Sequence, residues 1–305
     1  MSEHLCGTPI AFIIFNRPDT AERVFAEIAK AKPPKLLVVA DGPRPSRPGE
    51  AEKCTATRAI IERVDWDCEV LTNYSDINLG CKHRVSSGID WVFQQVEEAI
   101  ILEDDCLPHP TFFRFCEELL ARYRDDERIA IISGDNFQSG RRQGNASYYF
   151  SRYTHIWGWA SWRRAWKHYD VEMKLWPQIK SGGWLNGVLA ESDGLDYWTK
   201  IFDRVYGGGI DTWDYQWVFA CWIQSGLSVL PNINLISNIG FGNDATHTQS
   251  GSPFAELPVG AMPFPLTHPS FVLRHRIADS HTHRIMFSQP LWRRVARQIR
   301  DAVRR

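Results

Sequence analysis

The chain has 305 residues, 44% of them hydrophobic, which is enough for one large domain or two modest ones with a packed core. Its formal net charge of −1 gives the whole molecule no field that would attract nucleic acid. Its seven cysteines include no Cys-x-x-Cys pair, which excludes a zinc ribbon, disfavours a disulfide framework and suits a reducing compartment. We see no secretory signal and no apolar run of 18 residues, so we expect a cytoplasmic protein.

The first 135 residues alternate between short apolar segments and longer amphipathic ones. The short segments are rich in β-branched and aromatic residues, as buried strands are, and the longer ones place apolar residues at helical spacing. The predicted strands are 9–15, 35–41, 68–73, 99–103 and 129–135, and the predicted helices are 20–31, 48–64, 83–96 and 110–123. This alternation predicts an α/β protein with a Rossmann-like, mostly parallel sheet flanked by helices.

The second half of the chain has a different texture. Ten of the thirteen tryptophans lie between Trp157 and Trp222, and the regular alternation stops. Trp159, Trp162 and Trp166 are spaced as on one face of a helix, which favours core packing for them. We therefore expect one globular unit whose second half is irregular and aromatic-rich.

Three adjacent carboxylates follow the apolar segment 99–102. They belong to Glu103, Asp104 and Asp105, which we call the acidic triplet. Two like charges about 6 Å apart at an effective dielectric near 20 repel by roughly 2–3 kcal/mol, so we expect a positive partner. A divalent cation is the simplest one, because hard carboxylate oxygens suit Mg²⁺ or Mn²⁺. The alternative is a solvated acidic turn before the next helix, stabilised by the helix dipole.

Two other predicted strands also end in polar residues. The first ends at Asn16 and Arg17, and the second ends at Asp41. Ligands bind beyond the carboxyl ends of the strands in an open parallel sheet. These residues and the acidic triplet are therefore candidates for one site.

The apolar strand, Glu-Asp-Asp, a short loop with proline and a Phe-rich helix resemble the metal motif of GT-A glycosyltransferases. The chain is most similar to the N-acetylglucosaminyltransferase I family and to bacterial hemolytic-protein-like sugar transferases. The similarity runs through WVFQQVEEAIILEDDCLPHPTFFRFCEELLARYRDDERIAIISGDN, then GWASWRRAW and WDYQW, over roughly residues 9–250. It implies a GT-A domain at 1–270, with a donor half at about 1–135 and an acceptor half at about 136–270, followed by a basic helical tail at 271–305.

The resemblance also implies a set of ligand contacts. The donor would be a nucleotide diphosphosugar, above all a UDP-sugar, bound together with Mn²⁺ or Mg²⁺. Asp105 would be the direct metal ligand. His247, in GFGNDATHT, is a second candidate for the metal shell, and the alternative is a solvated loop histidine. The residues implied to contact the nucleotide are Phe15, Asn16, Arg17, Asp41, Arg84, Glu103 and Asp104, with Asp41 at the uracil.

The reaction that the resemblance implies is sugar transfer with inversion to a glycan or a lipid-linked glycan. An acidic residue in DTWDYQW would take the proton of the acceptor hydroxyl. Asp214 is our candidate for this base, and Asp211 is its competitor. A helix cap or a surface acid is the alternative for Asp214. Arg84 or Lys82 could stabilise the leaving diphosphate.

Three tryptophans near these residues have two interpretations. Trp157, Trp213 and Trp217 could stack on sugar rings, or they could belong to the core. The last two flank Asp214, and apolar neighbours of this kind raise the pKa of a carboxylate.

The end of the chain is basic. From Phe271 to Arg305 there are nine Arg and two Asp, a local net charge of +7, which leaves −8 for the rest. PLWRRVARQIRDAVRR places Leu291, Val295, Ile299 and Val303 on one helical face. A basic amphipathic helix of this kind predicts peripheral contact with the anionic inner face of a membrane. The alternative is a packing helix or an oligomer contact.

Three hypotheses of function follow. The first is a metal-dependent, inverting glycosyltransferase. The second is a sugar-phosphate nucleotidyltransferase, which also uses Asp-bound Mg²⁺ but needs a glycine-rich phosphate loop after the first strand, and Asn16-Arg17-Pro18-Asp19 contains no glycine. The third is a non-catalytic glycan-binding module, which would have no need for the acidic triplet together with Asp214.

Overall fold

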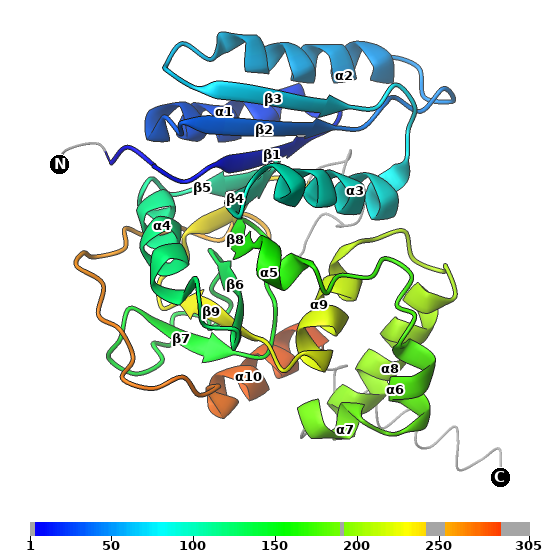
Figure 1. The fold of residues 1–305 in the computed structure, drawn as a ribbon, viewed down its shortest axis with the longest axis vertical. Helices are drawn as coiled ribbons and strands as arrows, with labels where there is room; N and C mark the ends of the chain where they lie inside the picture. The colour runs from blue at the N-terminus through cyan, green and yellow to red at the C-terminus, as the bar shows by residue number, and fades with distance from the viewer. Residues whose placement is uncertain (1–3, 190–191, 242–253, 288–305) are drawn as a thin grey trace.

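The computed structural model describes residues 4–189, 192–241 and 254–287 (Figure 1). Two predicted features, the metal ligand His247 and the amphipathic helix over 291–303, lie outside these residues. The strands are β1 (Ile10–Ile14), β2 (Lys35–Ala40), β3 (Glu69–Tyr74), β4 (Glu98–Glu103), β5 (Cys106–Pro108), β6 (Ile129–Ser133), β7 (Tyr148–Ser151), β8 (Trp159–Trp162), β9 (Leu227–Pro231) and β10 (Ile236–Asn238).

The helices alternate with the strands in the first half of the chain and gather together in the second half (Figure 1). They are α1 (Pro18–Ala31), α2 (Glu50–Ala59), η1 (Ile60–Arg63), α3 (Gly80–Gln95), α4 (Thr111–Tyr123), α5 (Arg163–Trp166), α6 (Trp176–Ser181), α7 (Leu185–Val188), α8 (Ser192–Tyr206), α9 (Asp214–Ile223), α10 (Arg276–Thr282) and η2 (His283–Phe287).

The main sheet has eight strands in the order β3-β2-β1-β4-β8-β6-β9-β7. The neighbours β3, β2, β1 and β4 pair in parallel, as do β6 and β9. Strand β8 runs antiparallel between β4 and β6, and β7 runs antiparallel to β9. The predicted α/β class with a mostly parallel, helix-flanked sheet is confirmed.

The prediction that Trp159, Trp162 and Trp166 lie on one helix is wrong. Trp159 and Trp162 are the ends of strand β8, and a short helix begins only at Arg163. In a strand, residues three apart point to opposite faces, and these two indoles accordingly pack in different core clusters on the two faces of the sheet. Their core packing was predicted correctly, since Trp159, Trp162 and Trp166 are all buried.

Two apolar layers enclose the sheet. Along β1, Ile10, Phe12 and Ile14 pack with α1 and α4 on one face, while Ala11 and Ile13 pack with α3, α5 and α9 on the other. Alternation of this kind is what buries both faces of a parallel strand. The carboxyl ends of β1, β2 and β4 are left as the polar edge of the sheet.

A third, aromatic cluster joins α6, α8 and α9. These helices lie together beside the sheet (Figure 1). The residues 276–287, which fall within the range expected to be a tail, pack against this second half. The Asp279 carboxylate accepts a hydrogen bond from the Ser151 hydroxyl at 2.6 Å, and Gln138 donates to the Thr282 hydroxyl at 2.9 Å. Among the described residues, no helix combines the length and apolar character that a membrane crossing requires.

Candidate functional site

A cleft of about 520 Å³ opens at the carboxyl ends of β1, β2 and β4. Strand β1 has β2 on one side and β4 on the other, so the strand order reverses there, and open α/β sheets bind ligands at such a point. The first half of the chain lines it with Ile13, Ile14, Phe15, Arg17, Asp41, Arg44, Asn78, Gly80, Cys81, Arg84, Val85, Glu103, Asp104 and Asp105. The second half adds Ile156, Trp157, Asp211, Thr212, Trp213, Asp214, Tyr215 and Asn238.

The cleft brings together most of the residues singled out from the sequence. Those that line it are Phe15, Arg17, Asp41, Arg84, Glu103, Asp104, Asp105, Trp157, Asp211, Trp213 and Asp214. Asn16 is not among its lining residues, and its side-chain amide donates to Glu50 at 2.9 Å instead. The described part of the segment before His247 ends at Phe241, and its Gly240 lies beside Asp105 and Arg17.

The acidic triplet has a positive partner within the chain. The two terminal nitrogens of Arg17 contact Asp104 Oδ1 at 2.6 Å and Asp105 Oδ2 at 2.8 Å. The other oxygen of Asp104 accepts from the Phe15 backbone N–H at 2.9 Å. Arg17 therefore neutralises part of the charge of the triplet, and the divalent cation stays a prediction.

The pairing with Arg17 does not remove the unfavourable interactions between the buried carboxylates of the triplet. Burial, with the charges of Asp105 and Asp104 added, raises the pKa of Glu103 to about 8. Burial also raises the pKa of Asp104 to about 6, although Arg17 opposes the rise. Burial would lower the pKa of Arg17, but the charges of the triplet raise it above its usual value. The site therefore holds more negative charge than Arg17 alone satisfies.

The carboxylates of the cleft suit a divalent cation that is bound jointly by the protein and a substrate phosphate, rather than one that is bound by protein ligands alone. Over the described ranges, no group of three or more His, Cys, Asp or Glu side chains is arranged to hold a metal. Mg²⁺ and Mn²⁺ do not require such a cage, because Mg²⁺ in particular usually binds through one or two carboxylates together with substrate phosphates. Asp105 and Glu103 both line the cleft and offer hard oxygen ligands, so the residues present fit a cation bound together with a diphosphate.

Asp41 is engaged in holding the start of α3. Its carboxylate accepts from the backbone N–H of Leu79 at 2.9 Å and of Gly80 at 3.1 Å, and from the Asn78 side-chain amide at 3.0 Å. The Gly42 N–H donates to it as well, at 2.9 Å. Four donors thus surround the carboxylate that the resemblance places at the uracil, and fixing the loop before α3 is the role that the geometry shows.

Arg84 and Lys82 are also bound within the protein. Arg84 donates to the carbonyl of Ala40 at 3.1 Å and to the backbone and side-chain oxygens of Asn73, so it ties together the ends of β2 and β3. Lys82 pairs with Glu172 at 3.2 Å and is not among the lining residues of the cleft. The expectation that Lys82 assists the leaving group is therefore corrected.

The two candidate bases lie in different settings. Asp214 is the first residue of α9, is half-buried in the cleft wall, and accepts a hydrogen bond from the Thr212 hydroxyl. Asp211 accepts from the backbone N–H of Cys81 at 3.2 Å and of Lys82 at 2.9 Å. The oxygens of Asp211 are thus committed to the first turn of α3, which leaves Asp214 as the better candidate.

For two of the three tryptophans considered for sugar stacking, the structure favours the alternative of core packing. Trp217 is 1% exposed, and Trp213 is 2% exposed and stacked on Trp159 with ring centroids 5.8 Å apart. Trp157 remains a candidate platform, because it is half-buried, lines the cleft and packs edge-on against Phe137. The sequence could not separate these cases, since all three indoles lie close to candidate site residues.

Several lining residues were missed from the sequence. Arg44 follows Asp41 by three positions, and its guanidinium lies over the Phe15 ring at 5.5 Å while it also pairs with Glu50. Asn78 lies in the loop before α3, which could have been noticed because it follows the end of a predicted strand. Thr212 sits inside the motif already quoted, but nothing in its spacing predicted its bond to Asp214.

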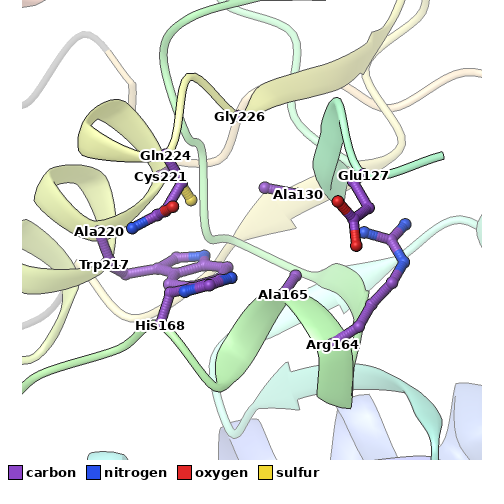
Figure 2. Close-up of a pocket in the computed structure, with 10 residues that line it drawn as sticks. All are labelled: Glu127, Ala130, Arg164, Ala165, His168, Trp217, Ala220, Cys221, Gln224 and Gly226. Atoms are coloured by element: carbon purple, nitrogen blue, oxygen red, sulfur yellow. The ribbon is translucent and has the colours of Figure 1, made fainter.

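A smaller pocket of about 120 Å³ lies at the amino ends of β6 and β9, at the edge of the sheet opposite the cleft (Figure 2). Figure 2 shows the carboxylate of Glu127 pointing toward the guanidinium of Arg164. Arg164 donates to the backbone carbonyls of residues 123, 124 and 129, so its role there is to fix the end of α4 to β6. We assign this pocket no ligand.

Comparison with known proteins yields no family by sequence. No protein-family model matches the chain, and no curated protein matches it. Among solved structures it is similar to 4-diphosphocytidyl-2C-methyl-D-erythritol synthase from Anaerococcus prevotii DSM 20548, with 10% identity over 55% of this chain and 77% of that one and a TM-score of 0.34. It is also similar to the inositol-1-phosphate CTP transferase from T. maritima, with 10% identity, 53% and 74% coverage and a TM-score of 0.30.

A third solved structure is UDP-glucose pyrophosphorylase complexed with UDP-glucose. It shares 12% identity over 47% of this chain and 61% of that one, with a TM-score of 0.26. All three are enzymes that handle nucleotides, and they belong to the class of our second hypothesis, the nucleotidyltransferases. At these TM-scores the likenesses do not decide between activities, and the fold assignment rests on the sheet topology itself.

Proposed function

We propose that the protein is a metal-dependent, inverting glycosyltransferase of the GT-A type. Its donor is a nucleotide diphosphosugar, with UDP-sugars first among the candidates, and its acceptor is a glycan or a lipid-linked glycan. The observation that carries the proposal is the composition of the cleft at the strand-order reversal. The acidic triplet and Arg17 come from the first half of the chain, and Asp214 comes from the second.

The positions of the charged side chains suggest a different role for each of them. When bound, Mn²⁺ or Mg²⁺ at Asp105 supplies the positive charge that stabilises the leaving diphosphate. Arg17 holds Asp104 and Asp105 in place, and Asp104 in turn fixes the Phe15 backbone at the end of β1. These contacts preorganise the edge of the sheet, so that little rearrangement is required on donor binding.

The proposed base lies on the side of the cleft that the second half of the chain forms. Asp214, oriented by the Thr212 hydroxyl, takes the proton of the acceptor hydroxyl. The acceptor oxygen then forms its bond to the anomeric carbon while the bond to the diphosphate oxygen breaks on the opposite face, and the diphosphate leaves with that electron pair. Attack opposite the leaving group inverts the anomeric configuration.

The second candidate is the sugar-phosphate nucleotidyltransferase, the class of the three similar solved structures. The two functions differ in the bond that breaks. A nucleotidyltransferase joins a nucleoside triphosphate to a sugar phosphate and releases pyrophosphate, whereas a glycosyltransferase consumes the finished nucleotide sugar and releases a nucleoside diphosphate. The segment Asn16-Arg17-Pro18-Asp19 after β1 argues for the glycosyltransferase, because it has no glycine that would let the backbone approach the phosphates of a nucleoside triphosphate.

One assay separates them. The purified protein is incubated with Mn²⁺ and a panel of nucleotide sugars, and in parallel with nucleoside triphosphates and sugar phosphates. We expect release of nucleoside diphosphate from one nucleotide sugar, and we expect Asp105→Ala to reduce that release by at least about 100-fold, since it removes the proposed metal ligand. Release of pyrophosphate in the parallel arm would establish the nucleotidyltransferase instead. Turnover in neither arm, with no nucleotide bound, would overturn both.

A further inference from the structure

We propose that Asp211 is a positioning residue that docks the segment carrying Asp214 onto the first turn of α3. The inference rests on the proposed function, because the group to be positioned is the candidate base. It differs from the expectation that Asp211 competes for the role of base. Asp211 lies in the second half of the chain, yet both of its hydrogen bonds reach the first half.

The first turn of α3 is held by two carboxylates from two parts of the molecule. Asp41, at the end of β2, accepts from the N–H groups of Leu79 and Gly80. Asp211 accepts from the next two, those of Cys81 and Lys82. The backbone N–H groups at a helix start have no partner within the helix, and a carboxylate there is also favoured by the helix dipole. The two acids together satisfy all four groups.

The sequence is built to allow this close approach. Gly80 has a φ of +77°, a conformation that favours glycine, and a Cβ added at this position would lie 2.8 Å from Asp211 Oδ2. Any other residue at position 80 would push Asp211 away from the helix. The glycine therefore serves the contact between the halves as well as the turn itself.

The segment from Asp211 to Asp214 is fixed from its own side too. The Gln216 side chain donates to the Thr212 carbonyl at 2.7 Å, and the Tyr169 hydroxyl donates to the Trp213 carbonyl at 3.1 Å. Thr212 bonds to Asp214 directly. Asp211 thus ends a short rigid run of backbone whose other end carries the candidate base.

The consequence for the reaction is geometric. The first turn of α3 also carries Cys81 and is followed by Arg84, both of which line the cleft where the donor would bind. Anchoring Asp214 to that turn sets its distance from the donor. A misplacement of about 1 Å can cost roughly 100-fold in rate, so the two charge-assisted bonds of Asp211 are well suited to control the rate.

The test is a double-mutant cycle. Asp211→Asn keeps the shape of the side chain but leaves one oxygen acceptor for two N–H groups. We expect it to lower kcat for transfer by about 10–100-fold, with the Kd for nucleoside diphosphate and Mn²⁺ within about twofold of the unmodified protein. In an Asp214→Asn background, the same change should cause no further loss, because Asp211 acts through Asp214. An equal loss in both backgrounds, or no loss in either, would overturn the proposal.

A second readout does not depend on activity. Hydrogen exchange should accelerate at the Cys81 and Lys82 amides and across residues 211–217 in Asp211→Asn. Unchanged exchange there would contradict the anchoring, whatever the enzymatic result. The matched control is Asp126→Asn, which alters a carboxylate that accepts from the Arg128 backbone N–H at 3.1 Å, at the amino end of β6. Absence of sugar transfer by the unmodified protein would instead overturn the proposed function and leave the exchange result to decide the anchoring.

Discussion

At the scale of single residues, Glu103 shows that the candidate site is kept at the expense of stability. It ends a buried strand, lines the cleft and lies beside two further carboxylates. Burial and those two charges raise its pKa to about 8. At neutral pH the folded protein therefore disfavours the ionised form, which a glutamate in water would adopt. Residues that are unfavourable for the fold and gathered in a cleft are typical of functional sites.

This gives a prediction with a definite sign. The pKa of Glu103 is higher in the folded chain than the usual 4.5, so the folded state binds the extra proton and loses stability as pH rises from about 4.5 to about 8. Glu103→Gln removes that loss. In chelator-treated protein, we expect the variant to melt above the unmodified protein at pH 8, by about 2 °C for each kcal/mol regained, with the difference shrinking toward pH 5.

The control for that experiment is Glu50→Gln. The hydrogen-bonded Arg44 lowers the pKa of the Glu50 carboxylate, so its ionised form is favoured in the fold, and its loss should lower the melting temperature at pH 8. A lower melting temperature for Glu103→Gln as well would mean that the Glu103 carboxylate contributes to stability, contrary to our account.

At the scale of elements, helix α3 links the sheet to the cleft. Its buried residues pack on β1, β2 and β4, and its first turn lies at the mouth of the site. The helix lies close to the sheet at Gly88, where an added Cβ would overlap the Val39 side chain on β2. Valine is β-branched and has little rotamer freedom to move aside.

Gly88→Ala should therefore destabilise the protein even though alanine favours helices. We expect the free energy of unfolding to fall by about 1–3 kcal/mol, the usual cost of overpacking a core, as measured by urea denaturation. Gly187→Ala in α7 is the matched control, because nothing lies within 4 Å of the added Cβ. Equal stability of the two variants would show that α3 can move off the sheet without cost.

The sequence predicted the elements of the first half well and those of the second half poorly. The five predicted strands of the first 135 residues all exist. Four of them are short apolar runs between turns, whereas β3 is an edge strand of mostly exposed residues. Strand β8 was read as a helix because its two tryptophans, three residues apart, fit a helical face, whereas they in fact point to opposite faces of the sheet. Only the pairing of β8 with β4 and β6, which are distant in the sequence, decides its conformation.

At the scale of the whole molecule, the candidate site exists only where the two halves meet. The sequence analysis located most of its residues, and the cleft brings eleven of them together with neighbours that were not predicted, such as Arg44 and Asn78. The hydrogen-bond partners of these residues could not be predicted from the sequence. Asp41 and Asp211 both bind backbone amides of α3, and Arg17 binds two of the acids, since these choices depend on contacts between 37 and 130 positions apart in the chain.

The most direct test of the account concerns Asp214, because the proposal gives donor binding and proton abstraction to different walls of the cleft. Binding of nucleoside diphosphate with Mn²⁺ is measured by calorimetry, and sugar transfer is measured on the same preparation of Asp214→Asn. We expect a Kd within about twofold of the unmodified protein and a loss of transfer of at least about 100-fold, the scale of a removed general base. Transfer at the unmodified rate, or an equal loss of binding and transfer, would contradict the assignment of Asp214 as the base.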